Sequence, residues 1–308
     1  MPMTNIVFLV SETDTIIQGN YLKFANEMLA RGANSHIAVV DSLALVRSSI
    51  VIQGFQLTTP LLTNEPFPKD LSTFELAEFD IVWIMSLGYR ESFLDKMQML
   101  YGLPGSCRIV NSLNALMHFK SKYFLASHAE TFAHPETHAS TSPEQLLDIV
   151  QSGGKWIAKP PAGSFGKEVY LLTQDDPNAA VILDSLTGLA QNKYCLLQRY
   201  VEEIEAGEKR VIFAGGEVVG QYIRTPTKDH RTNIMQGAAA TLCELTDEES
   251  TYCDKIGQLM KSYDAEFVGM DLAYPWVIEF NVITPGGIDT ISHLGGPDLT
   301  KNVLDKIL

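Results

Sequence analysis

The chain has 308 residues, of which 45% are hydrophobic and 19% charged, a composition typical of a folded globular protein. Its formal net charge of −14 argues against a nucleic-acid partner, because binding a phosphate backbone needs concentrated Lys and Arg. The opening apolar run "NIVFLV" is too short to cross a membrane and has no basic region before it, so we expect neither a signal peptide nor a membrane partner. The four cysteines show no CxxC spacing, which favours reduced thiols in the cytoplasm.

The first part of the chain alternates strand and helix patterns. Residues 5–10 predict a strand, 15–32 a helix that Gly32 ends, and 35–40 a second strand. The pattern repeats in a strand at 79–86, a helix at 90–102 and a strand at 106–112, after a proline-rich connection at 58–72. Such alternation is typical of a parallel sheet, so residues 1–118 are predicted to form an open α/β domain.

The rest of the chain, residues 119–308, reads as rich in antiparallel strands. A helix is predicted at 142–154, a hairpin at 208–223 that turns at Gly215 and Gly216, and a helix with an acidic first turn at 246–263. A second hairpin is predicted at 265–283. We expect two lobes here, 119–195 and 196–308.

A loop at 159–168, "KPPAGSFGKE", joins two strand-like segments. It is not a P-loop, since Pro161 stands where the first glycine belongs and Glu168 follows Lys167. GxGxxG is absent as well, which leaves hydride chemistry without support. Lys159 at the strand end and the glycines of the loop would suit a phosphate, although a simple connection with a solvated lysine explains this stretch equally well.

The second hairpin carries a set of oxygen ligands. Glu279 and Asn281 are two positions apart on one strand, so they share a face. If the turn centres on Pro275, Asp271 lies directly opposite Glu279. Carboxylate and amide oxygens suit Mg²⁺ that bridges to nucleotide phosphates. The alternative is an edge hairpin with solvated acids.

Two further stretches could bind a ligand but have simpler explanations. An apolar strand that ends at Gln198 and is followed by acids suits a purine and its ribose, but the acids Glu202, Glu203 and Glu205 fit a solvated turn better. His128, His134 and His138 lie close together in the sequence without HExxH spacing, and Pro135 interrupts any helix there. We do not expect a metal site at these histidines.

Taken together, these segments resemble the ATP-grasp superfamily and, within it, the bacterial glutathione synthetases. The resemblance rests on the order and spacing of five segments: "IVNSLNAL…FKSKYFLA", "IAKPPAGSFGKEVYLL", "YCLLQRYVEEIEAGEKRVIFAGGEVVGQYIR", "RTNIMQGAAA" and "FVGMDLAYPWVIEFNVITP". It implies an α/β protein with an α+β ATP-grasp fold, in which the N-terminal open α/β domain precedes a two-lobed ATP-grasp domain.

The resemblance also implies roles for residues at matching positions. ATP would be held by Lys122 (with Lys120 as the alternative), Lys159, Gly163, Ser164, Phe165, Gly166, Gln198, Tyr200, Val201 and Glu208. The metal ligands would be Asp271, Glu279 and Asn281, for two Mg²⁺ ions with Mn²⁺ as an alternative. The catalytic residues facing the transferred phosphate and the acyl intermediate would be Arg210, Arg224 and Asn233.

Family chemistry then implies an ATP-dependent ligase that joins a carboxylate to an amine through an acyl phosphate. The sequence departs from the family where the substrates would bind, at "SLGYRES" (86–92), "GSFG" (163–166), "RTN" (231–233) and "ITPGGIDT" (283–290). Arg90 is a candidate for gripping a substrate carboxylate, against the alternative of an ordinary surface arginine. γ-Glutamylcysteine and glycine are the closest guess; the alternatives are another small amino acid or peptide, or a non-catalytic ATP-binding protein. A homo-oligomer would be typical of such ligases.

Overall fold

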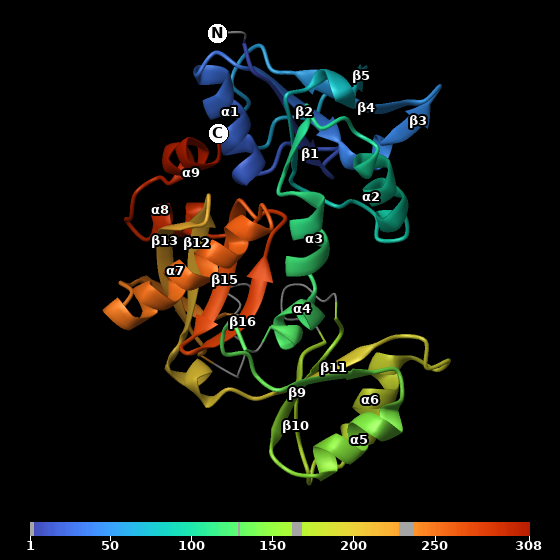
Figure 1. The fold of residues 1–308 in the computed structure, drawn as a ribbon, viewed down its shortest axis with the longest axis vertical. Helices are drawn as coiled ribbons and strands as arrows, with labels where there is room; N and C mark the ends of the chain where they lie inside the picture. Colours follow the sequence, from blue (N-terminus) through green and yellow to red (C-terminus); the bar gives the residue numbers. More distant parts are fainter. Residues whose placement is uncertain (1–2, 129, 162–167, 228–236) are drawn as a thin grey trace.

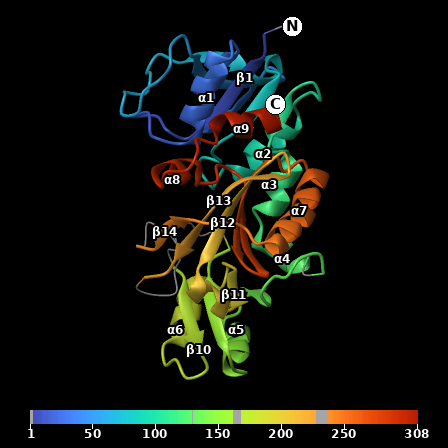
Figure 2. The ribbon, with the colours of Figure 1, turned by 90° about the vertical axis from the view of Figure 1, so that its left-hand side faces the viewer.

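The structure, a computed structural model, describes residues 3–128, 130–161, 168–227 and 237–308. Within these ranges the chain forms three β-sheets that follow one another along the long axis of the molecule (Figure 1). A seven-stranded sheet lies at the N-terminal end, a five-stranded sheet in the middle and a four-stranded sheet at the opposite end. The view turned by 90° shows the same order (Figure 2).

The N-terminal sheet has a parallel core. Its parallel strands are β1 (Asn5–Val10), β2 (Asn34–Val39), β6 (Ile81–Ile84) and β7 (Arg108–Val110), in the order β2-β1-β6-β7. Ile6, Val7 and Phe8 are fully buried, as expected of a strand covered on both faces. This core confirms the open α/β sheet predicted from the alternation of strands and helices.

Three antiparallel strands extend this sheet and were not predicted. They are β3 (Ala44–Val46), β4 (Ser49–Gln56) and β5 (Ser72–Glu75), and β4 pairs with β2 as well as with β3 and β5. Buried and exposed positions largely alternate along β4, as expected of a strand with one covered face. The proline-rich residues 58–72 lead from β4 to β5.

The helices of this part are α1 (Asn20–Ala30) and α2 (Phe93–Tyr101), with short 3₁₀ turns η1 (Val40–Ser42) and η2 (Leu76–Glu78). Helix α1 begins five residues later than predicted. Gly19 before it is extended, with φ 173° and ψ 176°, and Thr15 forms an isolated bridge with Pro66. Helices α3 (Leu113–Phe119) and α4 (Lys122–Ser127) then lead to the next lobe, and Ser112 and Ser121 accept capping bonds at their N-termini.

The four-stranded sheet is antiparallel and has the order β10-β9-β11-β8. Its strands are β8 (Thr137–Ser140), β9 (Lys155–Lys159), β10 (Tyr170–Thr173) and β11 (Cys195–Arg199). Helices α5 (Pro143–Gln151) and α6 (Ala179–Thr187) pack on it, and Leu146, Leu172 and Leu197 belong to a separate core. Helix α5 follows the predicted pattern, since Ser142 caps it and Pro143 occupies its first turn.

The five-stranded sheet contains both predicted hairpins. Its order is β14-β13-β12-β15-β16, and its strands are β12 (Glu208–Ala214), β13 (Glu217–Thr225), β14 (Ala239–Leu242), β15 (Phe267–Ala273) and β16 (Trp276–Asn281). Gly215 and Gly216 turn the first hairpin with φ values of 57° and 74°, which glycine adopts without strain. The 3₁₀ turn η3 (Glu202–Ala206) precedes the sheet, and helix α7 (Asp247–Ser262) packs on it with a capping box at Thr246.

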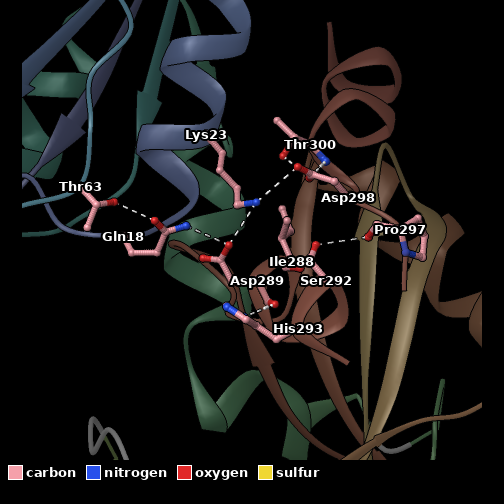
Figure 3. A network of polar contacts seen from close by, with 10 residues as sticks. All are labelled: Gln18, Lys23, Thr63, Ile288, Asp289, Ser292, His293, Pro297, Asp298 and Thr300. Atoms are coloured by element: carbon pink, nitrogen blue, oxygen red, sulfur yellow. Dashed lines mark hydrogen bonds and ion pairs between the residues drawn. The ribbon is translucent and has the colours of Figure 1, made fainter. Parts of the chain in front are cut away.

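The C-terminal segment joins this middle part to the N-terminal domain. Helices α8 (Ile288–His293) and α9 (Thr300–Ile307) follow the sheet, and α9 packs against α1. Figure 3 shows the polar side of this junction: Lys23 of α1 pairs with Asp289 at 3.1 Å and with Asp298 at 3.4 Å. Gln18 also donates a hydrogen bond to Asp289 at 3.1 Å. Opposite charges therefore connect the start of α1 to the first turn of α8 and to the loop before α9.

A buried asparagine adds a second tie between the two parts. Asn111 follows β7, and its Nδ2 donates to the carbonyls of Phe267 and Val282 at 2.8 and 2.7 Å. Its Oδ1 accepts from the backbone N–H groups of Glu266 and Phe267, both at 2.7 Å. One side chain thus connects the N-terminal sheet to the beginning of β15 and the end of β16.

No helix in the described ranges is long and apolar enough to cross a membrane.

Candidate active site

The second hairpin of the five-stranded sheet brings together the three predicted metal ligands. Asp271 on β15 lies directly opposite Glu279 on β16, as predicted. The turn consists of Tyr274 and Pro275 rather than centring on Pro275, and a register shift between Asp271 and Leu272 produces this pairing. Asn281 donates a hydrogen bond from Nδ2 to Asp271 Oδ2 at 3.3 Å. The three oxygen-bearing side chains therefore lie on one face of the hairpin.

Two buried arginines converge on Asp271. Arg210 lies opposite it across β12 and β15, and its Nε and Nη2 donate to Oδ1 and Oδ2 at 2.6 and 3.2 Å. Arg224 Nη2 lies 2.7 Å from Asp271 Oδ1 and also donates to Glu208. Burial alone would raise the pKa of Asp271, but the two guanidinium groups outweigh it and hold this pKa below its usual value. Asp271 is therefore ionised at neutral pH.

The guanidinium group of Arg224 contains one donor without an acceptor among the described residues. Its Nε is buried and has no hydrogen-bond partner in the part of the chain that the structure describes. A buried donor without an acceptor costs free energy, and a guanidinium group matches the oxygens of phosphates and carboxylates. The position of this donor beside Asp271 fits a site that takes an anionic ligand.

The hairpin has the donor chemistry that Mg²⁺ prefers. Two carboxylates and one amide oxygen leave positions for water and phosphate oxygens, which usually complete the coordination of this ion. Among the described residues, no three His, Cys, Asp or Glu side chains gather as a metal site.

Two lysines reach the site from other elements. Lys122, at the start of α4, pairs with Glu279. Lys159, at the end of β9, is half-buried and donates to Gln198 Oε1 at 2.8 Å. Burial, followed by repulsion from Lys122, lowers the pKa of Lys159 to about 8. The four-stranded and five-stranded sheets thus contribute cations and carboxylates to the same place.

Lys120, the alternative to Lys122, lies differently. Its ammonium is 5.9 Å from the centre of the Phe93 ring, at the start of α2. Burial, followed by the charges of Arg90 and Lys122, lowers the pKa of Lys120. Arg90 itself is exposed, in the loop that leads to α2. Lys122, rather than Lys120, has the direct contact with Glu279.

The residues predicted to line a nucleotide lie at the end of β11 and directly after it. Gln198 and Val201 are buried, and Gln198 lies beside Lys159. Tyr200 is half-buried, and its hydroxyl donates to Glu205 at 3.2 Å. Glu208 is buried and accepts a hydrogen bond from Arg224. The acids of η3 are not buried, as expected of a solvated turn. Gly163, Ser164, Phe165, Gly166 and Asn233 lie outside the described residues.

Sequence reasoning missed one residue at this site. His134 is buried, and its Nε2 lies 3.2 Å from Gln198 Nε2. The sequence places His134 next to Pro135 and far from Gln198, and no spacing pattern connects them. Only the pairing of β8 with β11 brings them together.

Comparison with known proteins identifies the family of this chain. Residues 122–296 match the family model described as the ATP-grasp domain of prokaryotic glutathione synthetase. Glutathione synthetase of Gloeobacter violaceus is 27% identical over 318 residues, which cover 98% of this chain and 96% of that protein. Glutathione synthetase of Rhodopseudomonas palustris is 26% identical over 291 residues, with 92% and 86% covered.

Solved structures with the same fold include ATP-grasp ligases. The ATP-grasp ligase PsnB, complexed with a minimal precursor, is similar with a TM-score of 0.64 at 16% identity, and 98% of this chain and 99% of that chain are covered. D-cycloserine synthetase DcsG is similar with a TM-score of 0.66 at 14% identity, with 98% and 97% covered. These similarities confirm the predicted ATP-grasp fold. Since the family model spans more than half of the residues, this chain belongs to the prokaryotic glutathione synthetase family of ATP-grasp proteins and is an ATP-dependent ligase.

Proposed function

We propose that this ligase transfers the γ-phosphate of ATP to a substrate carboxylate and then joins the acyl group to an amine. The amine attacks the acyl phosphate, an amide bond forms, and ADP and phosphate leave. The observation that carries the proposal is the meeting of three oxygen ligands on one hairpin with cations from α4, β9, β12 and β13. Phosphoryl transfer depends mainly on such positioned charges.

Each predicted site residue has a role in this proposal. Lys122, Lys159 and the loop of Gly163, Ser164, Phe165 and Gly166 hold the phosphates, Gln198, Tyr200 and Val201 line the purine, and Glu208 receives the ribose. Asp271, Glu279 and Asn281 hold Mg²⁺, with two ions as the expected number and Mn²⁺ as an alternative. Arg210, Arg224 and Asn233 face the transferred phosphate and the acyl group. Bound Mg²⁺ would neutralise phosphate charge.

The charges of the described residues support these roles. Arg210 and Arg224 both neutralise Asp271, and Lys122 neutralises Glu279. An incoming metal ion competes for these carboxylates, and incoming phosphates compete for the cations. Ligand binding would therefore exchange one set of buried ion pairs for another, which limits the cost of desolvation.

A cavity next to this site suits a small polar substrate. It has a volume of about 300 Å³, and its wall includes Glu12, Gln18, Asn20, Thr284, Gly286 and Asp289. Arg210 Nη1 donates to the carbonyl of Gly286 at 3.0 Å, so the same loop borders both the cavity and the charged cluster. Asn20 fixes this loop by donating to Thr284 Oγ1 and to the carbonyl of Pro285, at 3.2 and 2.9 Å.

γ-Glutamylcysteine and glycine are the first substrate pair of the proposal, and other small amino acids or peptides come next. Arg90 remains the candidate for a substrate carboxylate, since it is exposed close enough to Lys120 to lower the pKa of that lysine. The proposal also includes the division into residues 1–118, 119–195 and 196–308, a cytoplasmic location and a homo-oligomer. Four cysteines without a disulfide are in keeping with the cytoplasm.

The test is the release of ADP and phosphate from Mg–ATP with a panel of acid and amine pairs. Glu279→Ala removes a metal ligand, and Glu217→Ala, an exposed acid on the same sheet, is the matched control. Release that needs both substrates, is lost in Glu279→Ala and persists in Glu217→Ala supports the ligase. Release with other pairs only would discard γ-glutamylcysteine and glycine. Binding of ATP without release across the panel would favour a non-catalytic ATP-binding protein.

A further inference from the structure

His134 lies on the far side of Gln198 from Lys159, in the segment just before β8. Its ring is buried against β16, and Nδ1 lies 2.7 Å from the carbonyl oxygen of Val277. A carbonyl only accepts hydrogen bonds, so Nδ1 carries the proton. Burial lowers the pKa of His134 to about 4, so the ring is neutral at pH 7. Its Nε2 is therefore an acceptor.

Thr137 provides a second acceptor next to it. The Thr137 hydroxyl donates its proton to the carbonyl of Pro135 at 2.8 Å. Its oxygen is then free to accept from the Gln198 amide, whose Nε2 lies 3.4 Å away. Gln198 Nε2 thus faces two acceptors, His134 Nε2 and Thr137 Oγ1, and it has two protons to donate.

These contacts determine the orientation of the Gln198 amide. With Nε2 directed at His134 and Thr137, the carbonyl oxygen Oε1 must point the other way, where Lys159 Nζ donates to it at 2.8 Å. A reversed amide would place a carbonyl against the His134 lone pair and an NH₂ group against the Lys159 ammonium. Both contacts would then be repulsive, so the network permits one orientation.

We propose that His134 is a positioning residue that holds the carbonyl of Gln198 toward the nucleotide and thereby favours adenine over guanine. This inference rests on the proposed function, in which Gln198 lines the purine. Adenine carries an exocyclic amino group that donates to a carbonyl, whereas guanine carries a carbonyl at the equivalent position. The second lone pair of Gln198 Oε1 accepts from the former and repels the latter. His134 thus sets base selectivity through Gln198.

The experiment measures binding of ATP and GTP by calorimetry, without substrates, in the wild type and in two histidine variants. His134→Ala removes one of the three contacts that orient the Gln198 amide and should lower the ratio of ATP to GTP affinity about fivefold to tenfold, as expected for one hydrogen bond. His138→Ala is the matched control, since His138 lies on β8 and its ring nitrogen is directed at Glu136, 2.9 Å away, rather than at Gln198. This variant should keep the wild-type ratio.

A second measurement needs no substitution. Nitrogen-15 NMR of the nucleotide-free wild type at pH 7 reports the tautomer of His134, and the network requires the proton on Nδ1. A proton on Nε2, or an unchanged affinity ratio in His134→Ala, would overturn the inference while leaving the ligase standing. If the wild type binds neither nucleotide, the proposed function fails together with the selectivity. The tautomer then still tests separately whether His134 orients Gln198.

Discussion

Replacement of Lys159 by methionine should stabilise the nucleotide-free protein, although Lys159 is a proposed ATP ligand. Burial lowers the pKa of this lysine from 10.5 to about 8, so keeping its charge at pH 7 costs the native state about 3 kcal/mol. Lys159→Met removes this cost. It also removes the donor to Gln198 Oε1, a loss of about 1 kcal/mol. The free energy of unfolding should therefore rise by about 2 kcal/mol at pH 7.

The stability gained by Lys159→Met should depend on pH, because the wild-type lysine loses its proton at a lower pH in the native state than in the unfolded state. Below pH 8, Lys159 is protonated in both states, and the full cost is present. Between pH 8 and 10.5 the unfolded chain still holds the proton that the native state has lost, so wild-type stability rises with pH. The difference in the free energy of unfolding between Lys159→Met and the wild type should therefore disappear over this pH range.

Urea unfolding at pH 7 and at pH 10, followed by tryptophan fluorescence, measures the gap; Trp156 lies on the same strand as Lys159. Lys155→Met is the control, because Lys155 lies four positions earlier on β9 and is exposed, with Glu202 3.1 Å away. Its free energy of unfolding should stay within about 0.5 kcal/mol of the wild type. A Lys159→Met variant less stable than the wild type at pH 7, or a gap that persists at pH 10, would refute the reasoning.

Three further substitutions test the packing around the site by denaturant unfolding. Asp271→Asn leaves Arg210 and Arg224 with less counter-charge and should lower the free energy of unfolding by about 3 kcal/mol; an unchanged value would mean that this cluster does not matter for stability. Asn111→Ala removes four hydrogen bonds, three of them buried, and should cost about 3 kcal/mol. A cost below about 1 kcal/mol would contradict its role in joining the two parts of the chain. Thr246→Ala removes the cap of α7 and should cost about 1 kcal/mol, whereas no loss would show the cap to be dispensable.

The sequence allowed part of the local geometry of the second hairpin to be predicted. A turn near Pro275 and the two-residue period of strands led to the correct pairing of Asp271 with Glu279, although the structure reaches this pairing through an unpredicted register shift beside Asp271. The parallel core was likewise predictable, because alternating strands and helices leave few topologies. Strands β3, β4 and β5 could not be predicted in this way, because they extend one edge of that core and do not alternate with helices.

The partners of the site residues could not be predicted from spacing alone. Arg210 meets Asp271 only because β12 pairs with β15, although the two residues are far apart in the sequence. His134 reaches Gln198 only through the pairing of β8 with β11. Sequence patterns report local period and turns, whereas these contacts depend on which strands become neighbours in a sheet.

The central claim, transfer of phosphate to a carboxylate, is tested most directly by trapping the acyl group with hydroxylamine. The protein is incubated with Mg–ATP, hydroxylamine and each acid of the panel, and hydroxamate and nucleotide products are measured. The account predicts a hydroxamate of one acid, formed with equal amounts of ADP and phosphate and absent in Glu279→Ala. Formation of AMP and pyrophosphate in place of ADP, or cleavage of ATP without any hydroxamate, would contradict it.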